Sequence, residues 1–146
     1  MTIQGLDHLV LTVRSIEKTI SFYCDVLGLT AETFNNGRMA LKFGSQKFNL
    51  HEVGREFEPK AAAPVPGSQD FCLVVELLSD YIKRLKKNGI SIIEGPVEKV
   101  GALGILNSVY IRDPDGNLIE LGEYQALSGH TLLKTNGGSM SGPQTK

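Results

Sequence analysis

An internal duplication constrains this chain more than any other feature of its sequence. A β-branched and aliphatic run opens near His8, and a helical pattern of apolar residues follows it and ends at Gly28. The same order of signals returns in the second half, where a strand-like run opens at Asp70 and a helical pattern ends at Gly89. The two strand starts lie 62 positions apart and the two glycines 61. This spacing predicts two copies of one structural unit.

Each copy has the pattern of one strand, one helix and three further strands. In the first half the predicted elements are a strand at 6–13, a helix capped by Ser15 at 16–27, and strands at 31–34, 38–43 and 47–53. In the second half they are a strand at 70–76, a helix capped by Ser79 that ends at 88, and strands at 90–94, 109–112 and 118–121. We therefore predict an α+β fold of two tandem βαβββ modules.

The domain boundaries follow from the loops between these elements. The modules are predicted to span about 3–55 and 68–125, joined by a linker at 57–67 that is rich in proline and alanine. A chain of 146 residues fits a single domain, which we place at 1–126. Residues 127–146 carry a Gly/Ser-rich stretch with little to bury, and we expect them to form a disordered tail.

Composition narrows the class of partner. Fifteen Lys and Arg balance sixteen Asp and Glu, which argues against a nucleic-acid-binding scaffold. No apolar run approaches the roughly 20 residues that cross a bilayer, so we expect no membrane partner and a cytoplasmic location. Cys24 and Cys72 each stand alone in an apolar segment, and we expect buried free thiols rather than a zinc finger or a disulfide scaffold.

Strand alternation predicts which side chains share a face. In the first strand Leu9, Leu11 and Val13 form an apolar row, which we expect to face the helices. The opposite face of the sheets would carry a set of polar side chains: His8, Asn49, His51, Asp70, Arg112 and Glu120. Imidazole and carboxylate groups suit a divalent metal such as zinc, iron, manganese, nickel or cobalt. An ordinary solvated sheet face would give the same alternation, so the pattern alone leaves both interpretations open.

Two end motifs carry a resemblance to a known family. The first is Asp7-His8-Leu9-Val10-Leu11-Thr12-Val13, and the second is Arg112-Asp113-Pro114-Asp115-Gly116-Asn117-Leu118-Ile119-Glu120. With the duplication, they resemble the vicinal oxygen chelate superfamily of glyoxalases, bleomycin-resistance proteins and extradiol dioxygenases. The run Gln46 to Glu52 is similar to the subgroup around glyoxalase domain-containing protein 5. The resemblance implies curved mixed sheets around a cup, with the helices on the outer face.

The resemblance also implies a ligand set, because metal-dependent members take ligands from the first and last strands of each module. Those positions fall on His8, Asp70 and Glu120, with Asn49 in the last strand of the first module and His51 two residues further along the same face. Two triads stay open, His8–Asp70–Glu120 and His8–His51–Glu120. Glu120 is also the candidate catalytic base, and Arg112, Asn49, Lys42 and Lys47 are candidates to hold the substrate.

The implied function is that of a small metal-dependent enzyme, a lyase, isomerase or dioxygenase-like protein, that acts on a small oxygenated substrate by Lewis-acid catalysis. Lactoylglutathione lyase activity is expected to be weak or absent, because Asn49 stands where that enzyme has a carboxylate ligand. The alternative is a non-catalytic protein that sequesters a drug or toxin in the same cup. Relatives of this size often build the cup from two chains, so we expect a homodimer.

Overall fold

The computed structural model describes residues 1–126, and the tail predicted at 127–146 lies outside them. The first module contains β1 (His8–Val13), α1 (Ile16–Ser21), the π-helical turn η1 (Phe22–Val26), β2 (Thr30–Phe34), β3 (Arg38–Phe43) and β4 (Gln46–Glu52). The second contains β5 (Asp70–Val74), α2 (Leu78–Lys87), β6 (Glu94–Val100), β7 (Ile105–Arg112) and β8 (Leu118–Tyr124). The predicted tandem βαβββ fold is confirmed.

Each module forms one mixed four-stranded sheet. The strand orders are β1-β4-β3-β2 and β5-β8-β7-β6, so the two sheets have the same topology. In each sheet the first and last strands of the module run parallel, β1 with β4 and β5 with β8, while the other pairs are antiparallel. As a result β1 and β5 both stand at a sheet edge, and each carries a predicted ligand at its first residue.

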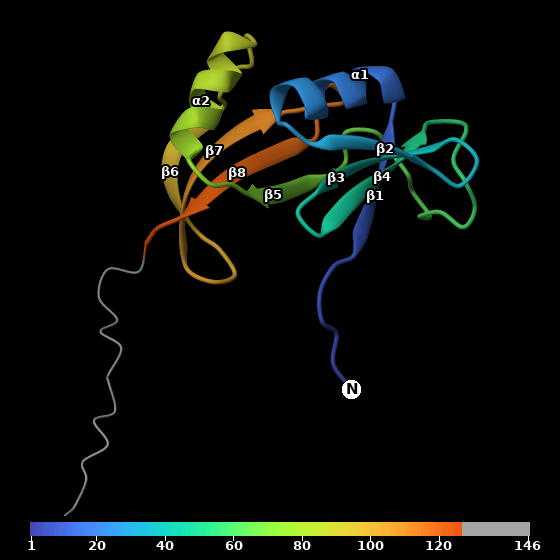
Figure 1. The fold of residues 1–146 in the computed structure, drawn as a ribbon, viewed down its shortest axis with the longest axis horizontal. Coiled ribbons are helices and arrows are strands. Elements are labelled where there is room, and N and C mark those ends of the chain that lie inside the picture. The colour runs from blue at the N-terminus through green and yellow to red at the C-terminus, as the bar shows by residue number, and fades with distance from the viewer. Residues whose placement is uncertain (127–146) are drawn as a thin grey trace, which may run out of the picture.

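The helices lie together on one side of the two sheets, as Figure 1 shows. The apolar rows of both sheets meet there in one core, which includes Leu11, Leu50, Ile111 and Leu121. Phe48 of β4 packs on Phe71 of β5 with ring centres 5.0 Å apart, so the core is continuous between the modules. The polar face is therefore left free of helices, as the alternation predicted. Among the described residues no helix is both long and apolar enough to cross a membrane.

Three local predictions need correction. The first helix does not run as one α-helix to 27, because it passes into η1 at Phe22. The second helix is not capped by Ser79: Leu77, in the left-handed region with φ of 56°, precedes its first residue. The predicted strand at 90–94 is mostly loop, and β6 begins at Glu94 and contains Pro96. Proline fits there because β6 pairs only with β7, so its missing N–H breaks no second ladder.

Candidate functional site

The helix-free face of the first sheet brings His8 next to two lysines. His8 pairs with Lys47 of β4, and Lys47 pairs with Lys42 of β3, so the three residues lie in one row across the sheet. The His8 side chain is 46% exposed, and its Nδ1 atom lies 2.7 Å from an Asp7 carboxylate oxygen. Its Nε2 atom forms no hydrogen bond with the described residues, and an imidazole with one nitrogen oriented by a carboxylate is a common metal-ligand arrangement.

The middle of the same face is buried. Asn49 is 6% exposed and His51 3%, and both point away from the helix-side core. Arg38 of β3 lies beside them, with its Nη2 atom 3.2 Å from Nε2 of His51. A guanidinium only donates hydrogen bonds, so Nε2 of His51 accepts and the ring proton sits on Nδ1. Burial and the positive charge of Arg38 lower the pKa of His51, which favours the neutral ring.

On the second sheet Asp70 and Glu120 share the helix-free face. Glu120 pairs with Cys72 in the parallel β5–β8 ladder, which makes Asp70 a diagonal neighbour of Glu120 on the same face. Asp70 is exposed, while Glu120 is half-buried. The Ser108 hydroxyl of β7 donates to a carboxylate oxygen of Glu120. Tyr110 lies directly opposite Glu120 in the ladder, so its hydroxyl is near the same carboxylate. The Ser108 hydrogen bond therefore holds one oxygen of this carboxylate.

The Glu120 carboxylate contributes to raised pKa values of two neighbouring side chains. Burial, together with the hydrogen bond and negative charge of Glu120, raises the pKa of Tyr110 to about 12. Burial and the charge of Glu120 also raise the pKa of the Cys72 thiol to about 11. Cys72 therefore stays protonated near neutral pH and is a poor nucleophile or metal ligand. Both cysteines are free, as expected, but Cys24 is only partly buried and Cys72 is an exposed residue, because its strand position faces away from the core.

The predicted ligands divide between the two sheets. His8 and His51 lie on the first sheet, and Asp70 and Glu120 on the second. Within residues 1–126 of a single chain, no three His, Cys, Asp or Glu side chains lie close enough together to hold a metal ion. His51 pairs with Thr12, four residues beyond His8 along β1, which separates the two histidines by about 13 Å of strand.

The remaining predicted substrate residues have different surroundings. Arg112 is exposed, and its Nη1 atom donates to the carbonyl of Gly116 at 2.8 Å, so it holds the turn before β8. Lys42 lies 3.9 Å from Glu32 on the neighbouring strand. Lys47 reaches across the sheet to the Phe34 ring, with Nζ 4.0 Å from the ring centre. Of the three cations, only Lys42 has a carboxylate partner among the described residues; Arg112 contacts a backbone carbonyl and Lys47 an aromatic ring.

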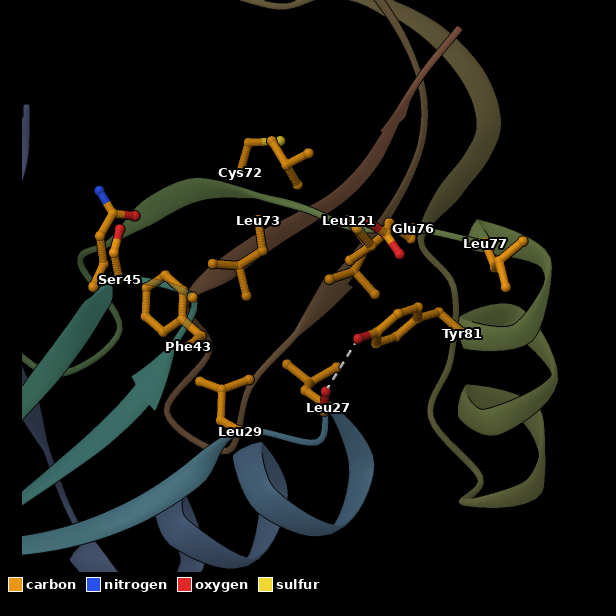
Figure 2. A pocket seen from close by; sticks show the side chains of 14 residues that line it. Leu27, Leu29, Phe43, Ser45, Cys72, Leu73, Glu76, Leu77, Tyr81 and Leu121 are labelled. Carbon is orange, nitrogen blue, oxygen red and sulfur yellow. Dashed lines mark hydrogen bonds between the residues drawn. The ribbon is translucent and has the colours of Figure 1, made fainter. Parts of the chain in front are cut away.

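Cavities lie on both sides of the sheets, and a shallow one of about 320 Å³ is lined by Lys42 and Lys47 themselves. A cavity of about 700 Å³ lies on the helix side between the modules, where Figure 2 shows Leu27, Leu29, Phe43 and Tyr81 around it. None of the predicted ligands lines it. Another cavity, of about 480 Å³, lies between the helix-free face of the first sheet and the linker. His51, Thr12 and Lys60 are among its lining residues.

Sequence reasoning missed Arg38, Ser108 and Tyr110. Arg38 could have been found by extending the alternation argument to β3, because the Ala40–Asn49 pair places it opposite His51. Alternation already puts Tyr110 on the polar face beside Arg112, but not in the candidate site. Ser108 lies two residues before Tyr110 on that face. The residue types gave no separate signal, because serine, tyrosine and arginine are ordinary on a solvated sheet face.

Comparison with known proteins agrees with this geometry. The family model described as Glyoxalase/Bleomycin resistance protein/Dioxygenase superfamily matches residues 5–121. The Glyoxalase domain-containing protein RDO1 of Mycosarcoma maydis is 52% identical over 86% of this chain and 71% of its own length. Virulence protein STM3117 of Salmonella typhimurium is 54% identical over 85% of this chain and 87% of its own. Its crystal structure superposes with a TM-score of 0.84, covering 86% of this chain and 100% of that one.

A more distant relative carries a metal-related name. Metallothiol transferase FosB of Staphylococcus haemolyticus is 29% identical over 82% of this chain and 83% of its own length. TnmS3 of Streptomyces sp. CB03234, described as an antibiotic binding protein, has the same fold at 22% identity and a TM-score of 0.67. The family match spans both modules and both end motifs, and the superposed fold agrees with it. The chain belongs to the glyoxalase, bleomycin-resistance and dioxygenase superfamily.

Proposed function

We propose that this protein is a metal-dependent enzyme that acts on a small oxygenated substrate, with His8, Asp70 and Glu120 as the metal ligands. The observation that carries the proposal is the placement of all three on the helix-free faces of two sheets with identical topology. One imidazole and two carboxylates form a suitable donor set for a divalent metal such as zinc, nickel, manganese, iron or cobalt. Family membership and the similarity to a metallothiol transferase support it.

We favour Asp70 over His51 as the third ligand. Asp70 is a diagonal neighbour of Glu120, whereas His51 lies about 13 Å of strand away from His8. The guanidinium of Arg38 also lies 3.2 Å from Nε2 of His51, where it blocks that nitrogen and repels a metal cation. The triad His8–His51–Glu120 is therefore the weaker of the two.

The site would be completed by a second copy of the chain. Within one chain the described residues do not bring three ligands together. β1 and β5 are both edge strands with free backbone groups, and each begins with an exposed ligand. A two-fold axis would set β1 of one chain beside β5 of its partner, and each dimer would contain two equivalent sites.

The neighbouring side chains suit catalysis on an anionic or enolic intermediate. A bound divalent metal supplies Lewis-acid stabilisation of negative charge on substrate oxygens. The Ser108 hydroxyl holds one oxygen of the Glu120 carboxylate, and Glu120 is the candidate base that would take a proton from the substrate. Lys47, beside His8, contributes a positive charge toward a substrate oxygen. We infer a lyase, isomerase or dioxygenase-like reaction; a dioxygenase would require iron and would consume oxygen with catechols.

Elemental analysis of the protein purified without chelator tests the ligand set. We expect about one divalent metal per chain, and loss of that metal in His8→Ala, Asp70→Ala and Glu120→Ala with unchanged circular dichroism. His51→Ala should keep its metal. Glu17→Ala, an exposed glutamate on α1, is the matched control for the carboxylates. Metal retained in both His8→Ala and Glu120→Ala would refute the assignment.

A mixing experiment tests whether the site spans two chains. Neither His8→Ala nor Glu120→Ala alone has an intact site. In a mixed dimer one site receives both substitutions and the other receives neither, so purified mixed dimers should regain about half of the wild-type metal. A site formed within one chain would regain none.

A second candidate function is sequestration of an apolar drug or toxin without catalysis. The 700 Å³ cavity of Figure 2 favours it, because its volume lies in the range of drug-sized sites and its walls are largely aliphatic and aromatic. A co-purified apolar compound detected by mass spectrometry, with no stoichiometric metal, would support sequestration over catalysis. We also retain the glyoxalase domain-containing protein 5 subgroup as a proposal, supported by the run Gln46 to Glu52.

A further inference from the structure

Four polar side chains on the helix-free face of the first sheet form a group that the proposed metal site does not use. Arg38, Lys47, Asn49 and His51 all lie on β3 and β4. Asn49 pairs with Ala40, which places Arg38 opposite His51 on the same face. We call these four residues the β3–β4 polar cluster.

Three atoms of the cluster are buried without a hydrogen-bond partner: Nε of Arg38, Oδ1 of Asn49 and Nδ1 of His51. They are the complete set of such side-chain atoms in the described part of the chain. A buried polar atom with no partner costs roughly 1–3 kcal/mol relative to a paired one. Three on one patch of sheet indicate a missing ligand rather than scattered packing faults.

The charge of the cluster is also unbalanced. The Arg38 guanidinium carbon lies 4.5 Å from the centre of the Phe57 ring and 5.4 Å from that of Phe34. The Lys47 ammonium shares the Phe34 ring, at 4.0 Å. Neither cation forms an ion pair with a carboxylate within residues 1–126, and residues 127–146 contain no aspartate or glutamate. Aromatic rings orient the two cations but do not neutralise them.

The nearest carboxylates are engaged elsewhere. Glu56 and Glu58 lie close enough to raise the pKa of His51, against the stronger lowering effects of burial and Arg38. Both face Lys60, with Nζ to carboxylate distances of 3.8 and 3.3 Å. Glu56 also accepts a hydrogen bond from the backbone of Gly54. A ligand could reach His51 through the 480 Å³ cavity under the linker, which His51 lines.

We propose that the β3–β4 polar cluster binds the oxyanion of a small molecule, a carboxylate or a phosphonate, against the rings of Phe34 and Phe57. The N–H groups of Arg38 and His51 would donate to the oxyanion, and Lys47 would add a second positive charge. The amide oxygen of Asn49 would accept from a hydroxyl of the ligand or from a bridging water. This inference deepens the proposed function, because it assigns an acidic group to the substrate, but binding can be measured without metal.

The test uses the full chain after chelation, titrated with benzoate, phenylphosphonate or neutral benzyl alcohol. Calorimetry gives affinity, and NMR follows the Nε–H signal of Arg38, identified by its loss in Arg38→Met. We expect at least one of the two anions to bind at least about tenfold more tightly than benzyl alcohol and to shift that signal. The anion that binds more tightly shows whether the site prefers a carboxylate or a phosphonate.

Variants distinguish a specific anion-binding site from nonspecific attraction of anions to positive charge. Arg38→Met should weaken anion binding at least about tenfold, and Arg38→Lys should give an intermediate loss, because it keeps the charge without the Nε–H donor. Arg55→Met, which removes an exposed arginine near the linker, is the matched control and should bind as the wild type does. Should Arg38→Met fail to fold, Arg38→Lys and Lys47→Met still decide the question.

Equal affinity for benzyl alcohol and both anions would overturn the oxyanion site, as would equal losses in Arg38→Met and Arg55→Met. Failure of the proposed function gives a different result. If the cluster is a site but the metal assignment is wrong, His8→Ala and Glu120→Ala will retain their metal in elemental analysis, while the chelated wild-type chain still binds the anion. A carboxylate of a partner chain seated on Arg38 would instead block every anion in the dimer, and that result would also refute the proposal.

Discussion

Replacing Tyr23 by phenylalanine will measure how strongly the two modules depend on each other. Tyr23 lies in η1 of the first module and is fully buried, and its hydroxyl donates to Oδ2 of Asp113 in the second module at 2.9 Å. Asp113 is 6% exposed and also accepts from the side chain of Asn117 and from two backbone N–H groups of its own turn. Asp113 therefore has four hydrogen-bond donors.

The magnitude follows from the charge and burial of this contact. A hydrogen bond to an ionised group contributes about 1.5–3 kcal/mol, and the phenylalanine ring leaves the packing of the site intact. Burial and the charge of Asp113 raise the pKa of Tyr23, so the phenol remains a donor across the working range of pH. With a urea m-value of about 2 kcal/mol/M, a loss of about 2 kcal/mol lowers the unfolding midpoint by about 1 M.

The assay is urea unfolding followed by circular dichroism, with Tyr81→Phe as the control. The Tyr81 hydroxyl reaches the carbonyl of Leu27 at 3.5 Å, at the limit of a hydrogen bond, and its residue is half-buried. We expect Tyr81→Phe to change stability by less than about 0.5 kcal/mol. Equal midpoint shifts for the two variants would refute the reasoning, since both remove one hydroxyl and only one removes a buried partner of a carboxylate.

Four further predictions concern other parts of the chain. Folding lowers the pKa of His51, so the unfolded chain binds a proton at this residue more tightly than the folded chain does. The free energy of unfolding should therefore fall from pH 7 toward 5, and His51→Gln should make that fall smaller in urea titrations. Gly67→Ala should lower the free energy of unfolding by about 1–3 kcal/mol more than Gly54→Ala does, as measured by thermal unfolding. Both glycines have φ near +80°, but only a methyl group at Gly67 would meet a backbone oxygen, that of Asp115. Truncation after residue 126 should leave the melting temperature and metal content unchanged; a drop of several degrees would place the domain boundary elsewhere. Turnover of the methylglyoxal–glutathione adduct should fall far below about ten per second, since Asn49 offers no carboxylate at its position.

The fold could be predicted from the sequence because its signals are local and occur twice. Two of these signals, the N-cap at Ser15 and the helix-ending glycine at 28, are borne out directly. Ser15 accepts a hydrogen bond from the Lys18 backbone, and Gly28 has φ of 80°. The errors fell where tertiary contacts outweigh local preference. The loop at 90–93 reads as a strand because its apolar residues Ile90 and Ile92 pack on the core, and Leu77 adopts a conformation that leucine alone would not choose.

The candidate site could be predicted only as far as alternation reaches. Alternation placed His8, Asn49 and Glu120 on the correct face, because the side-chain period of a strand is independent of what lies beside it. It could not supply the neighbours on adjacent strands, since register depends on hairpin geometry and on the parallel pairing of β1 with β4. Arg38 beside His51 and Ser108 beside Glu120 are such neighbours, and both change what the predicted residue can do.

The neighbouring side chains also bear on why residue 49 is not a carboxylate. On the second sheet, Ser108 donates to one oxygen of the Glu120 carboxylate, and Tyr110 lies opposite it in the ladder. On the first sheet, the ligand position that the resemblance implies in the last strand is occupied by Asn49, which is neutral. His51, two residues further along, lies beside the positive charge of Arg38. A carboxylate at residue 49 would compete with an incoming anion for the cations of the β3–β4 polar cluster. The neutral amide of Asn49 leaves those cations without a competing charge, so in our proposals the same residue removes one carboxylate ligand from the metal site and favours anion binding at the cluster.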